Sequence, residues 1–91
     1  MRVSWNRKAL FDLERVHALL ESGSTALASR TVQMLASAPD QLLTYPGMGE
    51  RLEGFEPDEV RRVLVGGYEL RYQVDGELIR VLRIWHELED R

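Results

Sequence analysis

The sequence predicts an α+β fold in which an N-terminal strand and a helical hairpin pack on an antiparallel sheet that ends in a three-stranded meander. The first half of the chain repeats its apolar residues every three or four positions, which is typical of helices. From Val60 onward the period becomes two, which is typical of strands. The pairs Gly66-Gly67 and Asp75-Gly76 then indicate tight hairpin turns between successive strands.

The length and composition indicate a single domain spanning residues 1–91. The chain has 91 residues, of which 44% are hydrophobic and 30% are charged. A chain of this length buries only about 60–65% of the surface that its unfolded form exposes, so we expect a folded partner to stabilise it noticeably. The absence of cysteine excludes disulfides, thiolate metal sites and thiol nucleophiles.

The charge and hydropathy pattern does not indicate a membrane protein or a general nucleic-acid-binding protein. No apolar run approaches the roughly 20 residues of a membrane span, and the opening Met1–Trp5 lacks the apolar stretch of a signal peptide. We therefore expect a cytoplasmic protein. Its 12 basic residues, all arginine except Lys8, stand against 15 acidic ones, and the net charge of −3 argues against a nucleic-acid coat protein.

The first predicted elements are a short strand and a helix. Arg2–Trp5 alternates in polarity, which is consistent with a strand at a sheet edge. Apolar residues at three- and four-residue spacing then predict a helix over about Asn6–Ser22. Gly23 suits the left-handed conformation that often follows a helix end. The apolar stripe of this helix consists of Ala9, Leu10, Leu13, Val16, His17 and Leu20.

A second helix is predicted directly after this turn, so that the two helices form an antiparallel hairpin. Ser24 can cap its start by accepting a backbone N–H. Pro39 clashes with the preceding turn of a helix, so the helix kinks or restarts there and Asp40–Thr44 adds a final turn or two. The apolar stripe of the second helix consists of Leu27, Ala28, Thr31, Leu35 and Ala38.

An irregular loop and three strands complete the predicted fold. Tyr45–Asp58 holds three glycines and two prolines, which is typical of a loop. Its larger apolar residues, expected to pin it to the core, are Met48, Leu52 and Phe55. Three antiparallel strands then follow at Val60–Val65, Tyr68–Val74 and Glu77–His86.

The strand register, counted outward from two-residue turns, predicts which side chains share a face of the sheet. The face away from the helices carries Arg62, Arg71 and Arg80 as a row across three strands, with Glu69 diagonal to two of them. Its other residues are Gln73, Leu78, Leu82, Ile84 and His86. The helix-covered face receives Arg61, Val63, Val65, Tyr68, Leu70, Tyr72, Ile79, Val81 and Arg83.

Two interpretations of the arginine row stay open. Directly opposed arginines destabilise a sheet by roughly 0.2–1 kcal/mol per pair relative to neutral pairs, so an anionic neighbour or solvent has to offset the repulsion within the row. In the simpler interpretation the row is the solvated side of an antiparallel sheet. In the other it belongs to a binding surface, because Leu78, Leu82 and Ile84 are predicted to form an apolar patch beside the cations.

The order and spacing of these segments resemble the RelE/ParE family of bacterial type II toxins. Residues 67–74, GYELRYQV, and residues 81–87, VLRIWHE, resemble the second half of that family. The helical hairpin and the turn YPGMG at residues 45–49 resemble the first half, so the resemblance covers nearly the whole chain. It implies a small toxin that is held inactive by an antitoxin encoded beside it, whose extended or helical tail wraps the toxin.

The resemblance implies one of two targets. RelE-type members cut mRNA in the ribosomal A site, whereas ParE-type members poison DNA gyrase. In RelE-type nucleases an arginine that holds the scissile phosphate directly follows the Gly-Tyr start of a strand, where this chain has Glu69, and a carboxylate there repels the phosphate. Further catalytic side chains of RelE lie near its C-terminus, where this chain has the acidic segment 87–90. These differences favour the ParE-like branch.

We therefore expect the toxin component of a type II toxin–antitoxin system that inhibits growth and stabilises plasmids. DNA gyrase is the expected target, and the expected partner is a cognate antitoxin of the ribbon-helix-helix or Phd-like class. Two alternatives remain. One is a metal-independent, ribosome-dependent mRNA endoribonuclease with His86, Arg80 and Arg71 at the phosphate. The other is a defunct toxin that only binds its antitoxin.

The candidate residues for binding the antitoxin or the target are Arg62, Arg71, Arg80, Leu82, Ile84 and His86. For His86 the simpler interpretation is that it caps the sheet edge or meets Glu87 or Asp90, and His17 on the helical stripe is expected to be structural. With two histidines and no cysteine, a metal site is not expected, and no cofactor or sequence-specific nucleic-acid binding is predicted.

Two further expectations concern packing. Trp5 and Trp85 are expected to pack at strand ends rather than to stack on bases. Arg83, predicted to emerge on the core side, is expected to pair with a carboxylate of the first helix, either Asp12 or Glu14.

Overall fold

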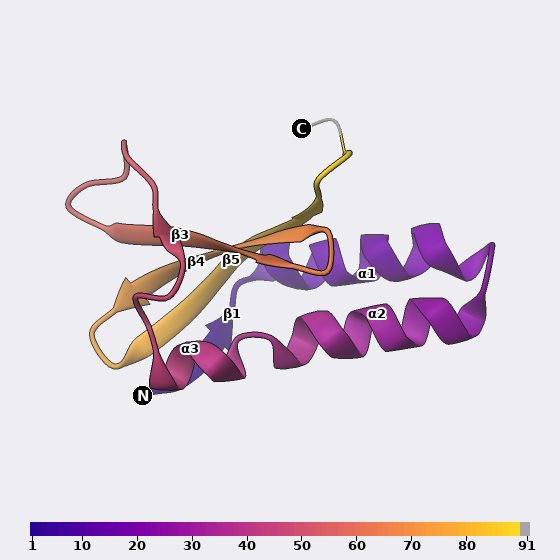
Figure 1. Ribbon diagram of the computed structural model, residues 1–91, viewed down its shortest axis with the longest axis horizontal. Helices are drawn as coiled ribbons and strands as arrows, with labels where there is room; N and C mark the ends of the chain where they lie inside the picture. Colours follow the sequence, from indigo (N-terminus) through magenta and orange to yellow (C-terminus); the bar gives the residue numbers. More distant parts are fainter. Residues whose placement is uncertain (90–91) are drawn as a thin grey trace.

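The computed structural model describes residues 1–89 and has the predicted α+β architecture (Figure 1). The elements, in chain order, are β1 (Arg2–Trp5), α1 (Arg7–Glu21), α2 (Thr25–Ser37), α3 (Asp40–Thr44), β2 (Glu50–Arg51), β3 (Glu59–Val65), β4 (Tyr68–Asp75) and β5 (Leu78–His86). The strands form a five-stranded sheet in the order β1-β5-β4-β3-β2. β1 is the predicted edge strand, but it pairs with β5 in parallel, so the sheet is mixed rather than wholly antiparallel.

The helical hairpin begins and ends close to the predicted positions because its caps are local. The Asn6 side chain accepts the Ala9 N–H at 2.8 Å, and the Ser24 side chain accepts the Leu27 N–H at 3.1 Å. Gly23 does not adopt a positive φ, so the predicted left-handed turn residue is wrong. Figure 1 shows α1 and α2 side by side, running past the end of the sheet. None of the helices within residues 1–89 combines the length and apolar character that crossing a membrane requires.

The core lies between the helical hairpin and one face of the sheet. Its helical side is formed by small and aliphatic residues of the predicted stripes and by α3. The fully buried members from both sides are Ala9, Val16, Leu35, Leu42, Leu70, Tyr72, Ile79, Val81 and Ile84. Each buried Leu, Ile or Val contributes roughly 1.5–3 kcal/mol relative to an exposed one, so this layer is the main source of stability.

The two hairpin turns follow the predicted chemistry with one shift. Gly66 and Gly67 both have positive φ, 53° and 86°, and Val65 pairs with Tyr68 as predicted. In the second turn Asp75 pairs with Leu78, so the loop residues are Gly76 and Glu77 rather than Asp75 and Gly76. Gly76 still supplies a positive φ of 59°.

A β-bulge in β5 changes the faces of its second half. Tyr72 pairs with Val81 but Arg71 pairs with Arg83, so Leu82 is the extra residue. The one-residue insertion exchanges the faces of every later residue. Arg83 therefore lies on the face away from the helices, and Ile84 lies in the core with no exposed surface. The predicted faces of Arg83 and Ile84 are both wrong for this reason.

Hydrogen bonds from Tyr72 and Arg61 hold the loop before the sheet, and of its three predicted apolar anchors Leu52 is half-buried while Met48 and Phe55 are exposed. Met48 is 45% exposed and Phe55 is 39% exposed, so the prediction that they pin the loop to the core is wrong. Instead the Tyr72 hydroxyl accepts the Gly49 N–H at 2.9 Å and donates to the Pro46 carbonyl at 2.7 Å. The loop thus depends on a side chain of the central strand.

Gly49→Ala is expected to destabilise the fold. A Cβ at position 49 lies 2.5 Å from the Arg62 carbonyl oxygen and 2.8 Å from the Tyr72 hydroxyl, so β3 and the loop must separate. We expect a loss of about 1–3 kcal/mol in the free energy of unfolding, measured by urea denaturation. Gly23→Ala is the matched control, because its Cβ has no neighbour closer than 3.7 Å. Equal stability of the two variants would contradict the prediction.

Candidate functional site

Four arginines gather on the sheet face away from the helices, here called the arginine face: Arg62, Arg71, Arg80 and Arg83. Arg62 pairs with Arg71, and Arg71 pairs with Arg83. Arg80 opposes Gln73, two residues along β4 from Arg71. The predicted sharing of one face by Arg62, Arg71 and Arg80 is confirmed. The predicted direct opposition of Arg71 and Arg80 is wrong, because the shifted turn places Arg80 opposite Gln73 and the bulge places Arg83 opposite Arg71.

A buried carboxylate lies at the centre of the arginine face. Glu69 is only 2% exposed, although it is on the face that lacks helices. Its Oε1 accepts from Arg62 Nη1 at 3.3 Å, and its Oε2 accepts from Arg71 Nη2 at 3.0 Å. The expected relief of the row by Glu69 is thus confirmed for Arg62, while Arg71 takes the place predicted for Arg80.

Further hydrogen bonds join arginines of this face to other carboxylates of the chain. Arg62 Nε donates to Glu50 at 2.7 Å, and Arg80 Nη2 donates to Asp75 at 3.0 Å. Arg83 Nε donates to Asp12 at 2.8 Å, which confirms the predicted pair with a carboxylate of the first helix. The row therefore needs no external anion, and electrostatic relief by an acidic partner ceases to be a reason for binding.

An aromatic side chain that the sequence analysis assigned only to packing lies between two of these arginines. The guanidinium carbon of Arg71 lies 4.8 Å from the Trp85 ring centroid, and that of Arg83 lies 4.7 Å from it. Arg71 also lies 5.9 Å from the centroid of Phe55. Each such contact contributes roughly 0.5–2 kcal/mol, depending on desolvation. Arg83 and Trp85 are two residues apart, so any register places them on the same face.

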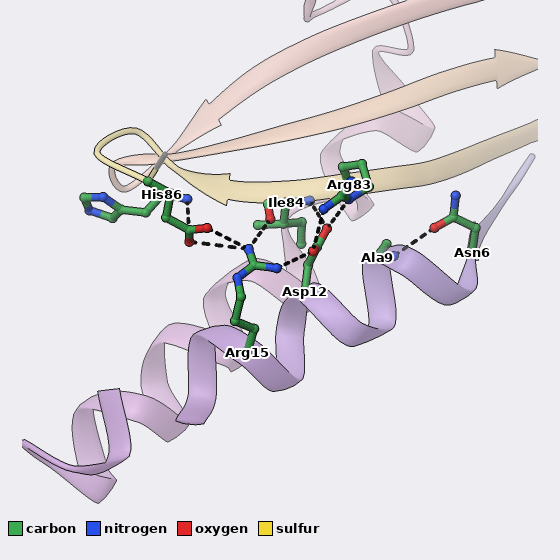
Figure 2. A network of polar contacts seen from close by, with 8 residues as sticks. Asn6, Ala9, Asp12, Arg15, Arg83, Ile84 and His86 are labelled. Atoms are coloured by element: carbon green, nitrogen blue, oxygen red, sulfur yellow. Dashed lines mark hydrogen bonds and ion pairs between the residues drawn. The ribbon is translucent and has the colours of Figure 1, made fainter. Parts of the chain in front are cut away.

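The edge of β5 beyond the bulge is closed by side chains from α1 (Figure 2). Asp12 is 2% exposed, and its Oδ2 accepts the Ile84 N–H at 2.8 Å. Arg15 Nη2 donates to the Ile84 carbonyl at 3.0 Å and also pairs with Glu89 at 3.0 Å. Burial raises the pKa of Asp12, but hydrogen bonds from Arg83, the Ile84 N–H and Arg15 outweigh it and hold that pKa below its ordinary value.

His86 lies on the helix side of the sheet, away from the arginine face. It pairs with Tyr68, and the two rings meet edge to face at a centroid distance of 4.9 Å. Its Nδ1 accepts the Leu88 N–H at 3.1 Å. The prediction that His86 lies beside Arg71 and Arg80 is therefore wrong, because the bulge moved it to the other face. Asp90, proposed as one of its neighbours, lies outside the described residues.

His86 also lines a pocket between α1 and the end of β5. The pocket has a volume of about 260 Å³ and is lined by Val16, Leu19, Leu20, Tyr68, His86, Leu88 and Glu89. His17 is not part of it; this half-exposed side chain lies 3.7 Å from the Glu21 carboxylate. Within residues 1–89 no three histidine, aspartate or glutamate side chains are grouped so that they could hold a metal ion.

Chemically, the arginine face is a neutralised cation layer with aromatic side chains, not an arrangement for proton transfer. Its guanidinium groups already donate to carboxylates, and the histidine that could move a proton lies on the other side of the sheet. Of the six predicted binding residues, Arg62, Arg71 and Arg80 share this face. Leu82 is the half-buried bulge residue, while Ile84 and His86 lie elsewhere.

Comparisons with known proteins agree with this architecture. The family described as "ParE toxin of type II toxin-antitoxin system, parDE" matches residues 3–91. A solved structure described as the chromosomal ParDE TA system from P. aeruginosa is similar to this chain with a TM-score of 0.78 and 24% sequence identity, covering 94% of this chain and 95% of that one. No match was found among curated proteins.

Asp12→Asn is expected to lower stability in a pH-dependent way. The lowered pKa of Asp12 means that its stabilising effect is complete above the unfolded-state pKa, near 4, and is lost as the pH falls through the folded-state pKa. We expect a deficit of about 2–4 kcal/mol at pH 7 that shrinks below about pH 4, measured by urea denaturation. Glu14→Gln, an exposed neighbour on the same helix, is the control and should change little. A deficit that stays constant down to pH 3 would contradict this account.

Arg71→Ala is expected to cost more stability than Arg80→Ala, although both remove an arginine from the same face. Arg71 contacts the buried Glu69 carboxylate and the Trp85 ring, so its loss should cost about 1–3 kcal/mol. Arg80 pairs with an Asp75 side chain that is 53% exposed, so its loss should cost under about 1 kcal/mol. Thermal and urea unfolding of the two variants provide the measurement, and the reverse order would refute the central role of Glu69.

Proposed function

This chain belongs to the ParE toxin family of type II toxin–antitoxin systems, and from this membership we propose that it stops bacterial growth by inhibiting DNA gyrase. As a ParE toxin it has an antitoxin partner. We propose further that a cognate antitoxin of the ribbon-helix-helix or Phd-like class neutralises it in the cytoplasm and that the pair serves plasmid stabilisation.

The observation that favours gyrase over mRNA is the buried carboxylate of Glu69. It lies at the strand position where the resemblance to RelE-type nucleases calls for a phosphate-holding arginine, and it already engages Arg62 and Arg71. The guanidinium groups that a phosphate needs at this face are therefore already bound to a buried carboxylate. Such a site suits a protein partner better than a polyanion.

The separation of the candidate catalytic groups supports the same choice. A nuclease built on His86, Arg80 and Arg71 needs these side chains around one phosphate. Here His86 packs against Tyr68 on the helix side, while the two arginines extend from the other face. The proposed residues for binding the antitoxin or the target are therefore Arg62, Arg71, Arg80 and Leu82.

The proposal is tested by expression of the toxin without its antitoxin. Growth arrest with induction of the DNA-damage response, together with inhibition of supercoiling by purified gyrase, is the expected result. Co-expression with the antitoxin encoded in the adjacent reading frame should restore growth. Cuts in ribosome-bound mRNA with unaffected supercoiling would assign the chain to mRNA cleavage instead. Harmless expression at high level would identify a defunct toxin.

A further inference from the structure

Residues 86–89, here called the His86 turn, fold back against the end of the sheet. The Glu87 N–H donates to the Gly67 carbonyl at 2.9 Å, and the Glu89 N–H donates to the His86 carbonyl at 3.0 Å. The Glu89 carboxylate accepts the His86 N–H at 3.2 Å and pairs with Arg15 of α1 at 3.0 Å (Figure 2). The turn is therefore fixed to the β3–β4 turn on one side and to α1 on the other.

One further hydrogen bond of the His86 turn uses a ring nitrogen. The Leu88 N–H donates to Nδ1 of His86 at 3.1 Å. An imidazole nitrogen accepts a hydrogen bond only while it carries no proton, so this bond requires a neutral ring with its proton on Nε2. Among the hydrogen bonds described for residues 86–89, it is the one made by the side-chain type that changes its charge between pH 5 and 8.

Protonation of His86 acts on the same atom that holds the turn. Because Nε2 already carries a proton, the second proton goes to Nδ1, and both nitrogens of the imidazolium are then donors. The Leu88 N–H and the new N–H at Nδ1 point at each other in the closed turn. A donor without an acceptor is destabilising unless it moves to another one. The neutral ring thus favours the closed turn, and the imidazolium favours a turn in which Leu88 has moved away to water.

The side chains packed around the ring are uncharged. On β4 the Tyr68 ring meets the imidazole edge to face at a centroid distance of 4.9 Å. Gly67, in the turn between β3 and β4, is so close that a Cβ added to it would lie 3.6 Å from Nε2. The side chains of α1 that share the pocket with the ring are Val16, Leu19 and Leu20. None of these groups compensates a positive charge on the ring.

The charged groups of the turn and of α1 do not pair with the ring either. The Glu89 carboxylate is held by Arg15 and by the His86 backbone N–H, and the Glu87 side chain is exposed. On α1 the Glu21 carboxylate lies beside His17 instead. Within residues 1–89 the ring of His86 takes part in no ion pair. A proton added to this ring therefore gains no carboxylate partner while the turn is closed.

Little apolar burial opposes movement of the turn. The Leu88 side chain is 88% exposed, so its displacement returns little apolar surface to water. Leu88 and Glu89 nevertheless form one wall of the pocket of about 260 Å³ between α1 and the end of β5. The other walls include Val16 and Tyr68, which are 1% and 8% exposed. Hydrogen bonds therefore decide whether the turn is closed, and its movement widens the pocket into an open apolar strip.

We propose that the His86 turn is a pH-sensitive latch, closed while the imidazole is neutral and released when Nδ1 takes a proton. The closed turn binds the neutral ring, so a falling pH shifts the population toward the released turn. Release exposes the apolar side chains of α1 and β4 that lie behind Leu88. The latch acts within the toxin itself and does not depend on which target or antitoxin the toxin binds.

The test is a pH titration of the isolated full chain by NMR, from pH 8 to pH 5. At pH 8 the ring ¹⁵N signals of His86 should show a proton on Nε2 alone, and the Leu88 amide should have an order parameter of about 0.85, as in a rigid backbone. At pH 5 both ring nitrogens should carry protons, and the Leu88 order parameter should fall below about 0.6. The Ile84 amide, which donates to Asp12, is the internal control and should stay rigid throughout.

Two substitutions of His86 separate its acceptor from its charge. His86→Asn keeps an acceptor oxygen at the δ1 position that takes no proton in this range, so the Leu88 amide should stay rigid at both ends of the titration. His86→Phe keeps an aromatic ring against Tyr68 but has no acceptor, so the Leu88 amide should be mobile at both ends. His17→Gln removes the other histidine and is the matched control, with the response of the wild type expected.

Several outcomes overturn the latch. A Leu88 amide that stays rigid while the imidazole is protonated refutes it, as does a ring that stays neutral down to pH 5. Loss of the response in His17→Gln assigns the response to His17 instead. Loss of order at Leu88 and Ile84 together shows opening of the whole strand edge rather than release of one turn. If the His86 variants do not fold, the wild-type titration alone decides, and growth arrest or gyrase inhibition is independent of every one of these results.

Discussion

The structure depends on the hydrogen bonds that α1 makes to the outward backbone groups of β5 beyond the end of β1. Parallel pairing with β1 stops at Val81, and a single residue, Asn6, separates the end of β1 from the start of α1. The helix therefore runs beside the second half of β5 and has to satisfy its outward backbone groups, which are costly to bury without a partner. Asp12 and Arg15 do so at Ile84, as a neighbouring strand would. The same contact holds α1 against the sheet, and thereby the whole helical hairpin.

The contact between α1 and the backbone of Ile84 depends on the bulge at Leu82. Without the extra residue, Ile84 would face solvent and its backbone would be turned away from the helix. With it, Ile84 fills the core, and Arg83 reaches around the strand to Asp12. Trp85 then follows on the arginine face, between Arg71 and Arg83. One inserted residue thus sets both the packing of the hairpin and the composition of the opposite surface.

The arginine face shows how a surface can be rich in cations without being an anion site. Glu69 is buried beneath Arg62 and Arg71, and the remaining arginines have their own carboxylates. These arginines are therefore already paired with carboxylates of the same chain, while the aromatic side chains of this face and the groove beside Leu64, lined by both polar and apolar residues, remain accessible to a protein partner. A chain of this size has a small core, so covering exposed apolar residues such as Leu64 with a partner also adds stability.

The sequence by itself determined the helices, the first strand and the three long strands, because these follow from local rules, but not β2, which lies within the segment predicted as an irregular loop. The caps at Asn6 and Ser24 and the glycine turn after Val65 involve neighbours in the chain. It also determined that Arg62 and Arg71 oppose each other, because that register is counted from one short turn. It placed Arg80 correctly on the same face, but it could not place Ile84 or His86, which lie beyond the bulge.

Only the tertiary structure decided the bulge, the parallel pairing of β1 and the burial of Glu69. No residue type in β5 signals the bulge, because Leu82 suits a regular strand position as well as the position of an extra residue. Its position is set by α1, whose Asp12 is seventy-two residues away from its Ile84 partner in the chain. Contacts of this separation leave no periodic signal in the sequence, and a single unpaired residue reverses every face that follows it.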